Sequence, residues 1–345
     1  MNTNTIACRI ALRAGIAALG LSLITGAPLT HAADSVTLTQ PVDSLSFFPV
    51  YVARAKGYFE EEGLEVNVKA TAGGGPHLTA VFAGEAEFTA SPGTYQINAL
   101  NQDKKVIGVI DLLHRNIIGM VIHKEAAAKV GITADMPLME RVKRAKGLTV
   151  GVTRPGALTD DLARNIFERA GLKVPGDVRI IGVGGAGTQL PAFRNRKIDI
   201  LTISTPHPER ILSEGLGIWF VNWAAGEDPA IKDFMMSTLM TTPQLVKEKP
   251  ELVQRMVRAL RKSIQYINDT SVDQLTKDMT PFFGKRVEPA ALRLSVQTVK
   301  GAVNPSGRMS EAAVATTFKL MKKPGKLESL KSLKLDDVWT GQFLK

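Results

Sequence analysis

The feature that most constrains the fold of this chain is a regular alternation of short apolar strands with helical stretches. Seven segments fit buried strands because they are apolar and partly β-branched. They are Val36–Thr39, Val66–Ala70, Phe88–Ala90, Val106–Asp111, Leu148–Val152, Val178–Val183 and Ile198–Ile203. Helical segments lie between them, and this order is typical of parallel, doubly wound sheets. The sequence therefore predicts an α/β fold.

The alternating pattern is also written twice. Each copy contains a Gly-Leu pair, a strand, a Gly-rich turn, a helix and a second strand that ends in serine. Gly63-Leu64 and Ser91 mark the first copy, and Gly171-Leu172 and Ser204 mark the second. Two copies of a long unit do not make a solenoid. They predict two lobes of the same design that face each other.

The N-terminus has the layout of a cleavable secretory signal. Arg9 and Arg13 precede an apolar stretch, Ala14–Ile24, which is too short to span a bilayer, and Thr30-His31-Ala32 supplies small residues for cleavage after Ala32. A short membrane anchor is the alternative. The only cysteine, Cys8, would leave with residues 1–32, so we expect no disulfide and no cysteine metal ligand in the mature protein. We expect a soluble periplasmic product.

The chain carries a formal charge of +10, which raises the question of a nucleic-acid partner. The charges are spread, with no block of five or six, and clusters such as Arg141–Arg144 fit solvated helix faces. We therefore expect no nucleic-acid partner. A diffuse attraction to anionic solutes or lipid headgroups is the better use of the excess charge.

Loops at the carboxyl ends of the predicted strands are the candidate ligand site, because such loops line the crevice of open parallel sheets. These loops carry Gly, Ser, Thr or Pro, and several lead into helices, whose first N–H groups attract anions. The candidate ligand-binding residues are Ser44, Phe47, Phe48, Gly74, Gly75, Ser91, Gly93, Thr94, Tyr95, Arg154, Gly156, Ala157, Gly185 and Ser204.

At these loops we expect the backbone N–H groups of Ser91–Thr94 and 156–158 to hold an anionic head group. Arg154 is a candidate bidentate ligand, although an exposed arginine beside a structural turn is the alternative. Phe47, Phe48 and Tyr95 are candidates to cover the apolar part of the ligand. Thr159 or Asp160 is expected to cap the helix that follows.

Other chemistry has weak support. The run Gly182–Gly187 matches G-x-G-x-x-G, but the next strand ends in Ser204-Thr205 instead of the acid that a dinucleotide site requires. The mature histidines, His77, His114, His123 and His207, form no metal motif, and no G-x-S-x-G elbow is present. We predict no enzyme activity, no metal site and no cofactor.

Several motifs in this order resemble the sulfonate/nitrate/taurine and thiamine-precursor solute-binding proteins of ABC transporters. They are Phe48–Ala53, Lys56–Leu64, 73–76, Ala83–Phe88, Lys146–Val152, Arg154–Gly156 and Lys197–Asp199, and the resemblance covers about residues 36–270. It implies a type II periplasmic binding fold, with residues 34–117 in lobe 1, 118–241 in lobe 2 and C-terminal helices over 242–345 completing lobe 1. Gly119–Lys124 and Phe234–Thr241 would be paired hinge-side strands.

The resemblance implies a transport receptor that binds a small anionic molecule and delivers it to a membrane permease. We expect it to act as a monomer. A periplasmic enzyme or sensor domain on the same fold, such as a thiamine-pyrimidine-related protein, is the alternative. The cysteine-rich motif of the eukaryotic thiamine-pyrimidine synthases is missing here.

Overall fold

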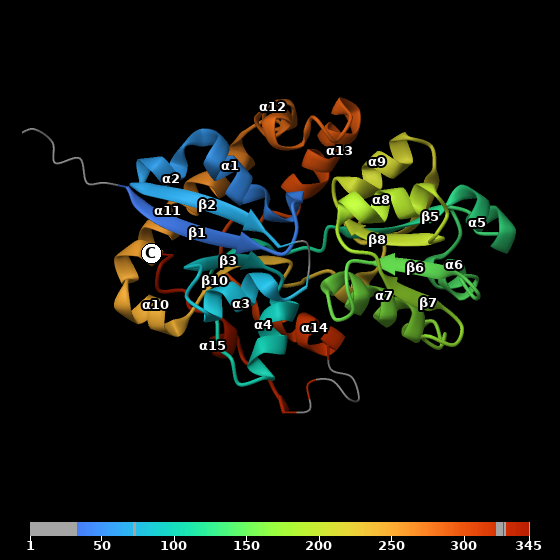
Figure 1. Ribbon diagram of the computed structural model, residues 1–345, viewed down its shortest axis with the longest axis horizontal. Helices are drawn as coiled ribbons and strands as arrows, with labels where there is room; N and C mark the ends of the chain where they lie inside the picture. Colours follow the sequence, from blue (N-terminus) through green and yellow to red (C-terminus); the bar gives the residue numbers. More distant parts are fainter. Residues whose placement is uncertain (1–32, 72–73, 322–326, 328, 345) are drawn as a thin grey trace, which may run out of the picture. The chain divides into compact units, whose positions relative to one another are not determined.

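Two five-stranded sheets form the frame of the protein in this computed structural model, which describes residues 33–71, 74–321, 327 and 329–344 (Figure 1). The strand orders are β2-β1-β3-β10-β4 and β7-β6-β8-β5-β9. Each sheet has helices around it, so the predicted α/β class is confirmed. The predicted signal peptide lies outside the described residues.

The first sheet is built on three parallel strands. β1 (Asp34–Gln40) lies between β2 (Leu64–Ala70) and β3 (Phe88–Ser91). β10 (Ser237–Thr241) then pairs antiparallel with both β3 and β4 (Ile107–Leu113). A strand from late in the chain is thus inserted between two early ones.

The second sheet repeats this design. β6 (Thr149–Val152) runs parallel to β7 (Arg179–Gly182) and β8 (Ile200–Ser204). β5 (Ile118–His123) pairs antiparallel with β8 and with β9 (Gly217–Asn222). The predicted repeat therefore corresponds to two sheets of matching topology.

The two expected hinge-side strands do not pair with each other. β5 lies in the second sheet and β10 in the first, because each is the first strand that the chain forms after it passes from one sheet to the other. β10 also falls inside the range 118–241 expected for lobe 2, yet it belongs to the first sheet. The chain crosses between the sheets at residues 114–117 and 223–236.

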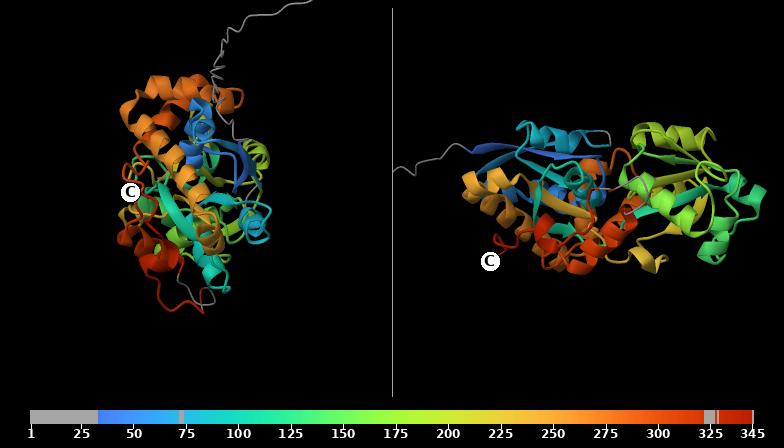
Figure 2. Two further views of the ribbon diagram at one scale, coloured as in Figure 1. Left: turned by 90° about the vertical axis from the view of Figure 1, so that its left-hand side faces the viewer. Right: turned by 90° about the horizontal axis from the view of Figure 1, so that it is seen from below.

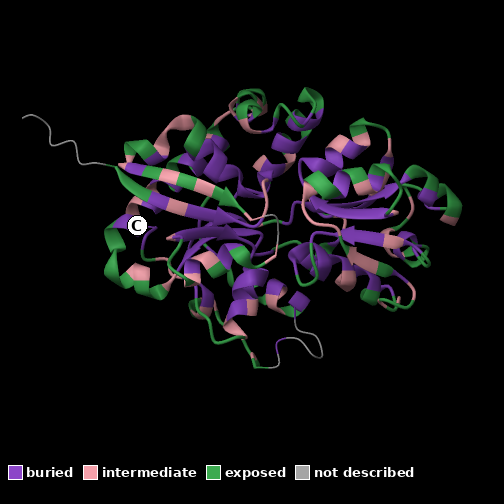
Figure 3. Ribbon diagram, viewed as in Figure 1, coloured by how far each residue is buried: buried purple, intermediate pink, exposed green. Residues whose placement is uncertain are grey.

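Helices cover the faces of both sheets. The strands β3, β4, β5, β8 and β10 are buried throughout, whereas the edge strands β2 and β7 are mostly half-buried or exposed (Figure 3). The α-helices are α1 (Phe48–Lys56), α2 (Tyr58–Glu61), α3 (Pro76–Phe82), α4 (Gly93–Leu100), α5 (Lys124–Val130), α6 (Leu138–Lys143), α7 (Leu158–Arg169), α8 (Ala186–Arg194), α9 (His207–Ser213), α10 (Pro243–Glu248), α11 (Pro250–Asp269), α12 (Val272–Phe283), α13 (Pro289–Lys300), α14 (Glu311–Met321) and α15 (Leu335–Val338). Two 3₁₀ turns are η1 (Leu45–Phe47) and η2 (Pro229–Ile231).

The long C-terminal helix α11 packs on the first sheet. Its apolar stripe faces α1, α2 and β4, and Arg258 pairs with Glu62, the residue that follows α2, at 2.8 Å. In Figures 1 and 2 this orange segment lies alongside the blue strands of that sheet. Farther along the chain, α13 contacts α9 and α14 contacts α7, so the C-terminal helices also reach elements of the second sheet.

No helix within the described residues is both long and apolar enough to cross a membrane.

Candidate functional site

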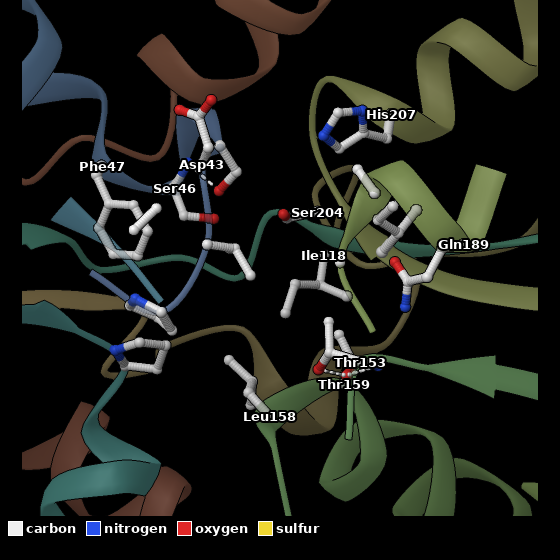
Figure 4. Close-up of a pocket in the computed structure, with 18 of the residues that line it drawn as sticks. Asp43, Ser46, Phe47, Ile118, Thr153, Leu158, Thr159, Gln189, Ser204 and His207 are labelled. Atoms are coloured by element: carbon white, nitrogen blue, oxygen red, sulfur yellow. Dashed lines mark hydrogen bonds between the residues drawn. The ribbon is translucent and has the colours of Figure 1, made fainter. Parts of the chain in front are cut away.

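A cavity of about 280 Å³ lies where loops from the two sheets meet (Figure 4). From the first sheet come the segment after β1 and the start of α4. From the second come the end of β6 and the starts of α7, α8 and α9. The lining residues are Pro41, Val42, Asp43, Ser44, Ser46, Phe47, Ala70, Pro92, Tyr95, Ile118, Thr153, Leu158, Thr159, Gly185, Ala186, Gly187, Gln189, Ile203, Ser204, His207, Met236 and Arg286.

The structure brings five of the predicted site residues together around this cavity: Ser44, Phe47, Tyr95, Gly185 and Ser204. The other nine lie outside the lining, and they are Phe48, Gly74, Gly75, Ser91, Gly93, Thr94, Arg154, Gly156 and Ala157. Phe48 shows why, because it is the first residue of α1 and its ring is buried in the core.

Three backbone donors expected for the ligand already serve acceptors of the protein. Gly93 N–H donates to the carbonyl of Met235 at 2.9 Å, and Ala157 N–H donates to the carbonyl of Arg154 at 3.1 Å. Gly156 N–H donates to the Asp160 carboxylate at 2.8 Å. The neighbouring N–H groups of Thr94 and Leu158 have no such bond to an acceptor among the described residues. Most of the backbone N–H groups predicted to bind an anion are therefore already hydrogen-bonded within the protein.

Arg154 is exposed and extends over the loop at Gly74. A Cβ added to Gly74 would lie 3.1 Å from the Arg154 Cδ, so the side chain of this second-sheet residue rests on a first-sheet loop. The structure thus places Arg154 outside the lining of the cavity.

Ser91 has a partner that its local sequence does not reveal. Its Oγ lies 2.8 Å from Nε2 of His77, and both side chains are fully buried. Burial lowers the pKa of His77 to about 4, so the ring is neutral at pH 7. The ring also meets Tyr95 edge-on at 4.6 Å between centroids. This pair supports the Tyr95 wall of the cavity from behind.

Neither Thr159 nor Asp160 caps α7 as predicted, because the N-cap is Ala157, which makes no side-chain bond. Thr159 Oγ1 instead accepts from the backbone N–H of Thr153 at 3.0 Å and lies 2.7 Å from the Thr153 hydroxyl. Two hydroxyls are thereby fixed at the end of β6 on the cavity wall.

Several lining residues were not predicted. Thr153 directly follows a predicted strand, so its position was a usable signal. Gln189 lies one turn into a helix, and Met236 and Arg286 come from distant segments, so no local pattern marks them. Only the packing of the chain brings these three to the site.

The cavity mouth carries an ion pair. The Asp43 carboxylate lies 2.6 Å from the Arg286 guanidinium and accepts the Tyr51 hydroxyl at 2.5 Å. The two paired side chains are 39% and 47% exposed, so their charges largely cancel in solvent. They are the only charged side chains among the described lining residues, because burial lowers the pKa of His207 to about 4.

On one side of the cavity the segments of the two sheets are in direct contact. Leu45 N–H donates to the carbonyl of Thr205 at 3.3 Å. The Thr205 hydroxyl donates to Glu209 at 3.0 Å, and burial raises the pKa of Glu209 to about 7. The start of α9 is thus anchored against the loop after β1.

The sequence profile of the NMT1/THI5 like family matches residues 44–270. The chain belongs to this family. It is 21% identical over 327 residues to the putative binding protein YtlA of Bacillus subtilis, covering 92% of each chain. Among solved structures, a Bordetella bronchiseptica protein has a TM-score of 0.78 at 21% identity, covering 91% of this chain and 96% of that one. The periplasmic aliphatic sulphonate binding protein SsuA of Escherichia coli has a TM-score of 0.66 at 11% identity, covering 90% and 93%.

This NMT1/THI5-like chain therefore has the two-lobe fold of periplasmic binding proteins, and its cavity lies between the lobes. The cavity offers donors that are mostly neutral. α7 and α8 both begin there, and the first N–H groups of a helix have no acceptor within the helix and carry a partial positive charge. In the part of the chain that the structure describes, no three His, Cys, Asp or Glu side chains are grouped so as to hold a metal ion.

Proposed function

We propose that this protein is a periplasmic solute receptor that captures a small organic anion between its lobes and delivers it to the permease of an ABC importer. The observation that carries the proposal is the cavity between the lobes. It is lined by residues from both sheets, and the N-termini of α7 and α8 form part of its wall. Its relatives' names as binding proteins support the receptor role. The exported form would begin after Ala32 and act as a monomer.

The head group, a sulfonate, carboxylate or similar oxyanion, would lie against the starts of α7 and α8. Backbone N–H groups at such positions bind anions, and the Thr153 hydroxyl and the Gln189 amide add neutral donors. The one arginine among the described lining residues, Arg286, is paired with Asp43, so neutral donors would carry the anion. Phe47, Ile118 and Leu158 would cover the apolar body of the ligand.

A screen of sulfonates, carboxylates, aromatic acids and pyrimidines by thermal shift on the mature protein tests the proposal. A ligand at a hundred times its Kd stabilises the folded state by about 2.7 kcal/mol. Calorimetry then measures the affinity of each hit. The bound ligand should be recovered chemically unchanged, whereas turnover would favour an enzyme on this fold.

Gly185→Leu locates the site. Gly185 is the N-cap of α8, lines the cavity, and has open space around its Cβ position, so a larger side chain fits without backbone strain and fills the cavity. We expect binding of the best hit to weaken at least about a hundredfold, since the head group is displaced from α8. Calorimetry measures this change.

Gly75→Leu is the matched control. Gly75 is also a helix N-cap with open space around its Cβ position, but it lies outside the cavity. The affinity of the Gly75→Leu variant for the best hit should stay within about twofold of the wild-type affinity. Unchanged affinity in Gly185→Leu, with the variant folded, would place the ligand elsewhere.

A further inference from the structure

We infer that the ligand brings a hydrogen-bond donor to α8 beside its anionic group, and that Gln189 recognises this donor. The inference rests on the proposed function, because it concerns the same cavity. It names the class of solute as a hydroxy acid or an N-acylated acid, in preference to an unsubstituted acid.

The observation is an unsatisfied amide. The Gln189 side chain is 0% exposed, lines the cavity, and makes no hydrogen bond through either Nε2 or Oε1 (Figure 4). Buried polar groups in proteins are nearly always hydrogen-bonded, since leaving one unpaired is destabilising. A carboxamide held in this state at a cavity wall is a group prepared for a ligand.

Three threonine hydroxyls near the starts of α7 and α8 have partners other than Gln189. The Thr188 hydroxyl donates to the carbonyl of Val183 and lies 3.0 Å from that of Gly185. The hydroxyls of Thr153 and Thr159 bond to each other at 2.7 Å. Within the described residues, then, none of these three hydroxyls is a hydrogen-bond partner of the Gln189 amide.

An anion alone satisfies only half of the amide. Its oxygens accept from Gln189 Nε2 and from the backbone N–H groups at Ala186 and Gly187, where α8 begins. The amide oxygen can only accept, and an oxyanion has no proton to donate. This conclusion does not depend on which way the amide is turned, because one acceptor remains in either orientation. An adjacent O–H or N–H on the ligand completes the set.

Matched ligand pairs test the inference by calorimetry. Hippurate and 3-benzoylpropionate differ by one amide N–H replaced by CH₂, and mandelate and phenylacetate differ by one hydroxyl. Wild-type protein should bind the donor-bearing member of at least one pair about tenfold or more tightly. In Gln189→Met, which keeps the side-chain length and removes the amide, the difference should fall to within about twofold.

A second measurement needs no ligand. Gln189→Met should raise the melting temperature of the empty protein by about 2–4 °C, because it removes a buried unpaired amide. Gln96→Met is the control, since Gln96 is also fully buried but its Nε2 donates to the carbonyls of Val106 and Val338 at 2.9 and 2.7 Å. This control should melt lower than wild type.

The outcomes separate the two proposals. If donor-free anions bind and are lost in Gly185→Leu, but Gln189→Met leaves discrimination within each pair unchanged, the receptor role stands and the role of Gln189 falls. If none of the four compounds binds, the solute class named here is wrong. A lower melting temperature for Gln189→Met would show that the protein itself holds the amide, which also overturns the inference.

Discussion

Asp111 is a fully buried acid in β4 that bonds to the neighbouring strand β10 and to the segment between α13 and α14. Thr238 of β10 donates to it at 3.1 Å, and Asn304 donates to its other oxygen at 2.7 Å. Burial raises the pKa of Asp111 to about 7, and these two bonds only partly oppose the shift. The folded protein therefore holds this proton more tightly than the unfolded chain does.

The sign of the pH effect follows. Between about pH 4 and 7 the unfolded state has lost the Asp111 proton while the folded state keeps it, so this group lowers the free energy of unfolding as pH rises. Asp111→Asn removes that dependence. Between pH 5 and pH 7 the free energy of unfolding of the variant, relative to that of wild type, should rise by about 2 kcal/mol. Urea denaturation at both values measures this, with exposed Glu85→Gln as the control. Parallel pH profiles for Asp111→Asn and wild type would contradict the assignment.

At the scale of elements, α4 is seated directly on the segment that crosses back to the first sheet. A Cβ at Gly93, the first residue of α4, would lie 2.5 Å from the Met235 Cβ. This close approach places the neighbouring Met236 and the α4 residue Tyr95 on the cavity wall. Packing of one helix start thus shapes part of the site.

Gly93→Ala should therefore lower the free energy of unfolding by about 1–3 kcal/mol, because the added methyl group overpacks a buried contact. The solute affinity should fall as well, since the segment that carries Met236 must shift. Gly75→Ala, at a helix start with open space, should change neither quantity by much. Denaturation and calorimetry on the two variants test the difference, and wild-type stability in Gly93→Ala would refute the packing argument.

At the scale of the whole molecule, two chain crossings join the lobes, and the site needs residues from both. Such an arrangement favours a hinge motion in which the lobes approach around the ligand, expelling water and strengthening the polar contacts. Small-angle scattering should show a smaller radius of gyration with a bound solute than without it. The ligand-blocked Gly185→Leu variant is the control and should not contract. An unchanged radius in wild type at saturation would argue against hinge closure.

Much of the fold was determined by local sequence. Each of the seven predicted strands overlaps an observed one, since alternating apolar and helical segments are short-range patterns. The loops at the strand ends were also predicted, and five of the fourteen candidate residues line the cavity. The family resemblance correctly indicated the two-lobe fold.

Only the tertiary structure decided which strands pair and which donors remain for a ligand. β10 pairs with β3 and β4 in the first sheet, and these partners are distant from it in sequence. The sequence could not predict this pairing, because an apolar strand does not specify its neighbours. Gly93 and Gly156 are donors at promising loops, but the fold uses both N–H groups itself. Gln189 carries no local signal, yet packing leaves its amide buried and unpaired at the cavity. Hydrogen-bond saturation is a property of the assembled structure, so it cannot be determined from local sequence alone.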